Sequence, residues 1–155
     1  MTQQKIAIAL PIEEKLLEPL HHWGEHFDWS EIKEVDFIHV VKKNVSPLEF
    51  GVVEMPDERT YKEMIPTLEQ HMKDEAKKIL PAGFTGEVHY HLTKEFSPED
   101  EVIETLKKLH PSLLVVSTRG KRGFEGLFHS SFADKMIKYA PCDVYVVRPE
   151  TQKSA

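Results

Sequence analysis

The sequence predicts an α/β domain in which helices cover both faces of a parallel β-sheet. Short apolar runs alternate along the chain with longer segments whose apolar residues recur at helical spacing, which is typical of parallel strands joined by right-handed crossovers. The run at 113–116, Leu-Leu-Val-Val, is too short for a helix and has the composition of a strand buried on both faces. At 155 residues the chain fits one domain with a single core.

Strand-like segments are spread along the whole chain. They lie at 5–10, 34–42, 87–94, 113–116 and 144–147. Apolar and polar residues alternate within 87–94, and this alternation indicates an edge strand with one face in water. Residues 44–56 are expected to form a loop between the second strand and the next helix.

Segments whose apolar residues recur at helical spacing lie between these strands. The segments with this spacing lie at 12–27, 57–80, 97–109 and 131–140. Pro19 is expected to kink or restart the first helix, because proline removes a backbone donor and crowds the preceding turn; Pro66 is a second possible kink. Ser97, followed by a proline and two acids, is a helix start signal, and Pro141 stops the last helix.

A basic loop lies between the run at 113–116 and the last helix. Residues 117–123, Ser-Thr-Arg-Gly-Lys-Arg-Gly, supply two glycines, two hydroxyls and three cations, and Ser130 and Ser131 stand where a helix N-cap would lie. Backbone amides and the amino end of a helix form a positive concavity that can receive phosphate. From the residues alone, a solvated basic surface followed by two capping serines is the favoured interpretation, and an anion site is the alternative.

The segment 115–149, VVSTRGKRGFEGLFHSSFADKMIKYAPCDVYVVRP, resembles the C-terminal signature of the universal stress protein family. KIAIALPIEEK at 5–15 resembles the first strand and loop of that family, and FIHVV at 37–41 resembles its second strand. The resemblance covers most of the chain. It implies one universal stress protein domain at 1–149, a flexible tail at 150–155, and a doubly wound five-stranded sheet of order 3-2-1-4-5, similar to the adenine nucleotide α-hydrolases.

Family members that bind ATP carry Gly-x2-Gly-x9-Gly-(Ser/Thr) between the fourth strand and the last helix. In this chain Ser117 stands at the first glycine and Gly120 matches the second. Ser130 stands at the third glycine and Ser131 matches the closing hydroxyl. The spacing is intact, but serine adds a side chain where glycine permits close approach of a phosphate. ATP-binding relatives also place an aspartate after the first strand, where Pro11 offers neither a carboxylate nor a backbone donor.

The resemblance implies a degenerate nucleotide or anion site in the crevice between the first strand and the basic loop, since open α/β sheets bind ligands where the strand order reverses. Val40 matches a position that packs near adenine in relatives. The implied site residues are Leu10, Pro11, Val40, Val116, Ser117, Gly120, Ser130, Ser131 and Phe132. We expect a stress-response or regulatory protein that does not bind ATP tightly and has no cofactor. The alternatives are an ATP-binding protein with weak hydrolysis and a protein-binding adaptor.

The composition of the chain argues against several classes of partner, location and crosslink. A formal net charge of −6 argues against broad nucleic-acid binding, which needs a basic surface. No apolar run is long enough to span a membrane, and the first residues lack the features of a signal peptide, so a cytoplasmic location is expected. Cys142 is the single cysteine, which excludes an internal disulfide.

No motif for a nucleophile or a catalytic metal stands out, so we do not expect an enzyme. Nine histidines suggest a metal site, because His22 and His26 lie four apart on a helix and His89 and His91 share a strand face. Neither pair has a convincing third ligand nearby, so no metal is expected.

Relatives of this family commonly form homodimers through their last strand. Residues 143–148, a Val-Tyr-Val-Val run flanked by charges, provide an edge of that kind, so a homodimer is expected. Trp23, Phe27 and Trp29 are expected to pack in the core or at an interface and not to hold a cofactor.

Overall fold

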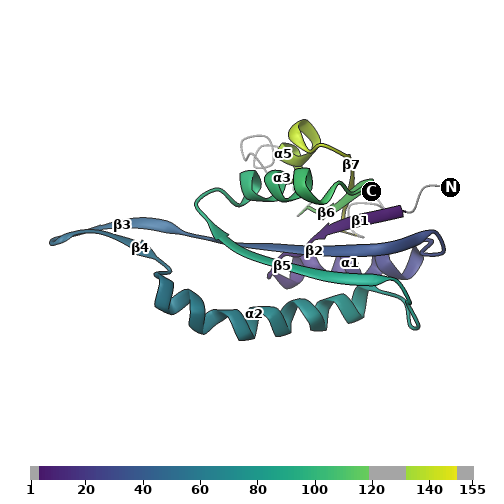
Figure 1. Ribbon diagram of the computed structural model, residues 1–155, viewed down its shortest axis with the longest axis horizontal. Coiled ribbons are helices and arrows are strands. Elements are labelled where there is room, and N and C mark those ends of the chain that lie inside the picture. Colours follow the sequence, from purple (N-terminus) through teal and green to yellow (C-terminus); the bar gives the residue numbers. More distant parts are fainter. Residues whose placement is uncertain (1–3, 119–131, 150–155) are drawn as a thin grey trace.

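The computed structural model describes residues 4–118 and 132–149, and its centre is a five-stranded parallel sheet (Figure 1). The strands lie in the order β5, β2, β1, β6, β7. Their bounds are Gln4–Ala9 for β1, Ile32–Lys42 for β2, Glu87–Glu95 for β5, Leu113–Ser117 for β6 and Asp143–Val147 for β7. Counted along the chain within this sheet, the order is 3-2-1-4-5, so the expected doubly wound topology is confirmed.

Helices cover both faces of this sheet. In the described part of the chain, α1 (Glu14–His26) and α2 (Glu58–Ile79) lie on one face, and α3 (Pro98–Leu109) and α5 (Phe132–Tyr139) lie on the other (Figure 1). A separate hydrophobic core fills the space under each pair of helices. None of these helices is long and apolar enough to cross a membrane.

The central strand, β1, is buried on both faces. Ile6 and Ile8 pack into the core under α1 and α2, whereas Ala7 faces the core under α3 and α5. All three side chains are 0% exposed. Because β1 pairs in parallel with β2 on one side and β6 on the other, the three strands end at the same edge of the sheet.

Two close contacts join α1 to α2. A Cβ atom added at Gly24 would lie 2.2 Å from the carbonyl oxygen of Ile79, so only glycine allows the helices to approach this closely. Trp29, in the segment that follows α1, also donates a hydrogen bond of 2.8 Å from Nε1 to the carbonyl oxygen of Gly24 and so holds that segment against α1. The His21 imidazole bonds to the buried Glu75 carboxylate, which extends the contact along both helices.

Capping side chains begin two of the helices where the sequence predicts. The Asp57 carboxylate accepts a hydrogen bond from the Thr60 amide at 2.7 Å at the start of α2. Ser97 Oγ accepts one from the Asp100 amide at 3.4 Å at the start of α3. The expected restart at Pro19 is wrong, because α1 continues through this buried proline to His26. Burial of the α1 face against the core offsets the backbone bond that Pro19 removes.

The expectation of a loop at 44–56 is also wrong. β3 (Asn44–Leu48) and β4 (Gly51–Met55) form an antiparallel hairpin that projects from the body of the molecule (Figure 1). The backbone at Gly51 has a φ of 139°, which a residue with a side chain rarely adopts, and this permits the tight turn. Pro47 within the first arm hid the strand pattern, since proline is rare inside strands.

The strand at one edge of the sheet, β5, confirms the predicted edge strand. β5 occupies this edge, and Val88 and Leu92 pack against the core under α1 and α2. Tyr90 lies between them in the sequence, is 37% exposed and stacks on Phe37 with ring centroids 5.8 Å apart. Trp23, Phe27 and Trp29 also pack together beside this core, as expected for structural aromatic residues.

Candidate functional site

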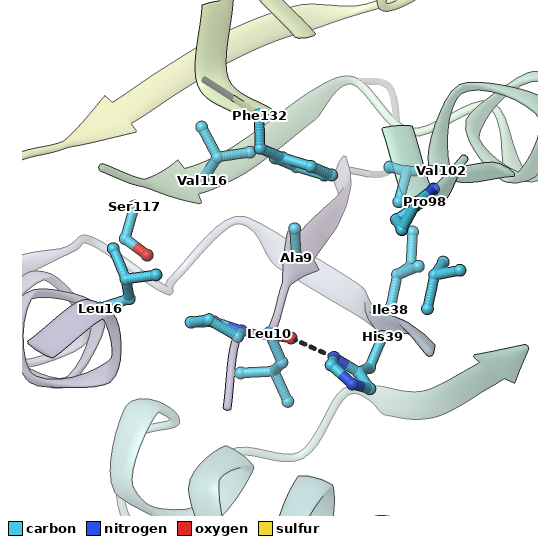
Figure 2. A pocket seen from close by; sticks show the side chains of 12 residues that line it. Ala9, Leu10, Leu16, Ile38, His39, Pro98, Val102, Val116, Ser117 and Phe132 are labelled. Carbon is cyan, nitrogen blue, oxygen red and sulfur yellow. Dashed lines mark hydrogen bonds between the residues drawn. The ribbon is translucent and has the colours of Figure 1, made fainter. Parts of the chain in front are cut away.

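A cavity of about 210 Å³ opens at the edge of the sheet where the parallel strands end (Figure 2). β1 and β6 are neighbours in the sheet, but the chain leaves them toward opposite sides of it, so this is where the strand order reverses. The start of α3, the start of α5 and the segment after β1 complete the wall. The lining residues are Ala9, Leu10, Pro11, Leu16, Ile38, His39, Val40, Pro98, Val102, Val116, Ser117 and Phe132.

Six of the nine implied site residues line this cavity. They are Leu10, Pro11, Val40, Val116, Ser117 and Phe132. The other three, Gly120, Ser130 and Ser131, lie outside the described residues, as do the cations of the basic loop and the tail at 150–155. The structure therefore places the strand-end half of the implied site and does not describe its phosphate half.

The described wall of the cavity is mainly apolar. Its polar side chains are Ser117 and His39, and Pro11 has no backbone donor. The backbone groups of Leu10 are already used, because its amide donates to the Ile38 carbonyl at 2.8 Å and its carbonyl accepts from His39. The Thr118 amide likewise donates to the Val147 carbonyl at 3.0 Å. The described wall therefore suits an uncharged, largely apolar group and offers few groups to an anion.

His39 is a cavity residue that the sequence analysis missed. Its Nδ1 donates a hydrogen bond of 2.7 Å to the Leu10 carbonyl oxygen, which orients the ring between β2 and the end of β1 (Figure 2). Its Nε2 is buried and has no hydrogen-bond partner among the described residues. Burial lowers the pKa of His39, the bond to Leu10 opposes this, and nearby His71 lowers it further. His39 is therefore neutral near pH 7, with Nε2 as an acceptor.

The other residues that sequence reasoning missed are apolar. Ala9, Leu16, Ile38, Pro98 and Val102 line the cavity at positions that strand or helix periodicity assigns simply to the core. No sequence signal separates a residue that faces a cavity from one that faces a packed neighbour. Only the three-dimensional arrangement of the strand ends identifies them.

The expectation that no third ligand lies near a histidine pair is wrong for His22 and His26. Glu25 lies with His22 and His26 on α1, and the ligand atoms of the three side chains are all within 4.8 Å of one another. Glu34 and Glu87 gather around His89 within the same limit. His91 belongs to neither group, since its Nε2 bonds to the buried Asp36 carboxylate at 2.7 Å. Both groups lie outside the cavity.

The burial of His39 predicts a pH dependence of stability. Its pKa is lower in the folded chain than in the unfolded chain, so its contribution is complete above the ordinary histidine pKa of about 6.5. This contribution is lost as the pH falls below that value toward the lowered pKa of the folded state. In urea unfolding between pH 7.5 and 5.5, the free energy of unfolding should decline less in His39→Gln than in the unchanged chain.

The exposed His110 provides the control for this measurement. His110 ends α3 with a φ of 54°, a conformation that asparagine tolerates, so His110→Asn removes a histidine without new strain. This variant should keep the full decline of the unchanged chain. An equal decline in His39→Gln and the unchanged chain would contradict the assignment.

Two sequence comparisons place the chain among known proteins. The Universal stress protein family matches residues 31–148. A universal stress protein of Methanocaldococcus jannaschii is 32% identical over 116 residues, which are 74% of this chain and 65% of that protein. The chain thus matches less than two thirds of the length of this relative.

The fold has many similar solved structures. A universal stress protein in complex with cAMP aligns with a TM-score of 0.64 and 15% identity, over 96% of this chain and 98% of that chain. A universal stress protein family protein from Arabidopsis thaliana with AMP bound aligns with a TM-score of 0.57 and 18% identity, over 98% of this chain and 95% of that chain. At such identities the likeness shows the fold. Because the family match extends over most of the sequence, the chain belongs to the universal stress protein family.

Proposed function

We propose that this chain is a cytoplasmic stress-response regulatory protein that has no reaction of its own and whose cavity holds the base of an adenine nucleotide weakly. The observation that carries the proposal is the apolar wall at the ends of β1, β2 and β6, which lacks a carboxylate at Pro11. The one cysteine of the chain agrees with a reducing compartment.

The size and lining of the cavity favour a flat, uncharged ring. A volume of about 210 Å³ is below the range of roughly 300–1,000 Å³ that is usual for drug-sized ligands, so a base fits it better than a whole nucleoside triphosphate does. Val40, Val116 and Phe132 supply apolar contacts, and burial of apolar surface is the main gain on binding. The AMP and cAMP bound to the two similar structures support an adenine base as the ligand.

The phosphate side argues against tight binding. Serines at 117 and 130 replace two glycines of the ATP-binding motif. On the strand-end side, Pro11 replaces the aspartate with which ATP-binding relatives hold the nucleotide. Arg119, Lys121 and Arg122 attract anions in general, but a charge alone does not orient a triphosphate. The ligand therefore gains most of its affinity from the base.

The chemistry of the one thiol supports a role without catalysis. Burial raises the pKa of Cys142, and neighbouring Asp143 raises it further. The reactive thiolate is thus disfavoured near pH 7, unlike in cysteine enzymes, where positive neighbours stabilise it.

Titration calorimetry of nucleotide-free protein with ATP and magnesium tests the proposed affinity. We expect a dissociation constant weaker than roughly 100 μM, which corresponds to a binding free energy of about −5.5 kcal/mol. Pro11→Asp should tighten binding about tenfold, since one hydrogen bond to a charged group contributes about 1.5 kcal/mol. The matched control Pro11→Ala removes the proline without supplying a carboxylate and should leave the affinity within about threefold of the original.

Two results would contradict the proposal. Low-micromolar, saturable binding of ATP by the unchanged chain would favour the ATP-binding alternative, and hydrolysis should then be assayed. Equal affinities of Pro11→Asp and Pro11→Ala would show that the missing carboxylate does not limit binding.

We also propose that β7 pairs with β7 of a second copy. β7 ends the sheet, and within the described residues its outer edge has no strand partner. Unpaired amides and carbonyls on an edge strand form a template for another strand, and pairing about a two-fold axis closes after two copies. Tyr145 on β7 is 49% exposed, and Ile137 and Tyr139 on neighbouring α5 are 60% and 62% exposed.

Analytical ultracentrifugation tests the dimer. We expect a dimer at micromolar concentration that Tyr145→Glu weakens at least tenfold, because the new charge would be buried against the second copy. Tyr90→Glu changes an exposed tyrosine on β5 at the opposite edge of the sheet and should leave the dimer intact. A monomer in the unchanged chain, or equal effects of both variants, would contradict pairing through β7.

A further inference from the structure

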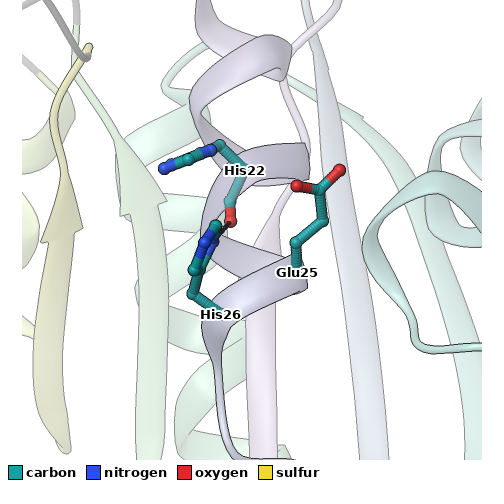
Figure 3. Close-up of side chains that lie close together, drawn as sticks. All are labelled: His22, Glu25 and His26. Atoms are coloured by element: carbon teal, nitrogen blue, oxygen red, sulfur yellow. Dashed lines mark hydrogen bonds between the residues drawn. The ribbon is translucent and has the colours of Figure 1, made fainter.

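His22, Glu25 and His26 come from neighbouring turns of α1 (Figure 3). Each can offer one ligand atom, and these atoms lie within 4.8 Å of one another. His22 lies three residues from Glu25 and four from His26, so each of them is a neighbour of His22 on the helix surface. Figure 3 shows Glu25 projecting from the other side of α1 than the His22 ring. The group lies apart from the cavity and has no part in the proposed nucleotide binding.

A backbone contact fixes the ring of His26. Its Nδ1 donates a hydrogen bond of 2.9 Å to the carbonyl oxygen of His22, so the proton of the neutral ring lies on Nδ1. Nε2 then carries the lone pair. Histidines that bind metals are commonly held in this way, because a bond at one ring nitrogen sets the orientation and tautomer that the other nitrogen needs.

The donor set suits a transition metal. Two imidazole nitrogens and one carboxylate oxygen are ligands of tetrahedral Zn²⁺, and three protein ligands leave the fourth position to water. Mg²⁺ and Ca²⁺ prefer sites made of oxygen atoms alone. The group also lies in the last turns of α1, where the partial negative charge of the helix end favours a cation.

The distances can contract to those of a bound ion. Tetrahedral bonds of about 2.1 Å place ligand atoms roughly 3.4 Å apart, so the atoms need to draw together from separations of up to 4.8 Å. Glu25 and His26 are exposed and His22 is half-buried. Rotation of the exposed Glu25 side chain toward the two imidazoles supplies this contraction without movement of the helix.

A second group of metal-ligand residues lies around His89 and is held by ion pairs. Glu34 Oε1 already lies 3.4 Å from Lys5 Nζ and 3.2 Å from His89 Nε2. His89 Nε2 also lies 3.3 Å from Glu87 Oε2, so this ring nitrogen bridges the two carboxylates. An incoming cation would have to displace the ammonium group of Lys5. The group around His89 is therefore an ion-pair network. It provides an internal control for the experiment below.

We propose that α1 carries a Zn²⁺ site formed by His22, Glu25 and His26, with water completing the tetrahedron. Bound Zn²⁺ would join two turns of α1 next to Trp23, which packs on the buried side of the helix. The ion would thereby stabilise the last turns of α1 against fraying.

The experiment uses the full chain after treatment with EDTA and dialysis. It is titrated with ZnCl₂ by calorimetry, and with Co²⁺ by visible absorption, whose intensity reports tetrahedral coordination. We expect one equivalent of Zn²⁺, with affinity at least tenfold weaker in both His22→Ala and His26→Ala. Glu25→Gln should weaken binding to a smaller extent, because an amide oxygen is a poorer ligand than a carboxylate.

Two controls make the outcome decisive. His89→Ala should bind Zn²⁺ as the unchanged chain does, and MgCl₂ should give no saturable heat. Circular dichroism establishes that each variant keeps its helices. The proposal is overturned if Zn²⁺ does not bind, if His22→Ala and His26→Ala bind it unchanged, or if His89→Ala abolishes binding.

Discussion

Burial of β1 on both faces is the constraint on which the rest of the structure depends. Ile6 and Ile8 require α1 and α2 on one side, and Ala7 requires α3 and α5 on the other. β1 must also pair with β2 and β6, so its carboxyl end lies between theirs. The chain turns to opposite sides after β1 and β6, and a cavity follows from that reversal. The residues that follow β1 therefore determine the chemistry of the crevice.

At that position the chain has Leu10 and Pro11, and the cavity becomes apolar. The backbone of Leu10 bonds to Ile38 and His39, and burial keeps His39 neutral by lowering its pKa. Among the described residues, the charged side chains lie outside the lining of the cavity, for example in the ion pair of Lys43 with Glu54 at 3.1 Å. The described wall offers apolar side chains and few polar groups. This lining is the physical basis of the proposal that the chain binds an adenine base weakly.

Much of the fold could be predicted because local and long-range signals agree. The short apolar runs predicted the strands, and the resemblance to the universal stress protein family predicted their order in the sheet. The β3–β4 hairpin was missed because Pro47 breaks its strand pattern. His39 and Pro98 were missed because periodicity cannot distinguish a cavity wall from a packed core. Glu87 comes next to Glu34 only through the register of β2 with β5, which no local pattern contains.

The central claim is that the cavity between the ends of β1 and β6 receives the base of a nucleotide. The most direct measurement is a titration of ¹⁵N-labelled protein with AMP, followed by amide chemical shifts, which detect weak binding. We expect saturating shifts centred on the amides of Leu10, Val40 and Val116, with the β3–β4 hairpin unaffected. Shifts confined to the hairpin, or no shifts at millimolar AMP, would contradict it.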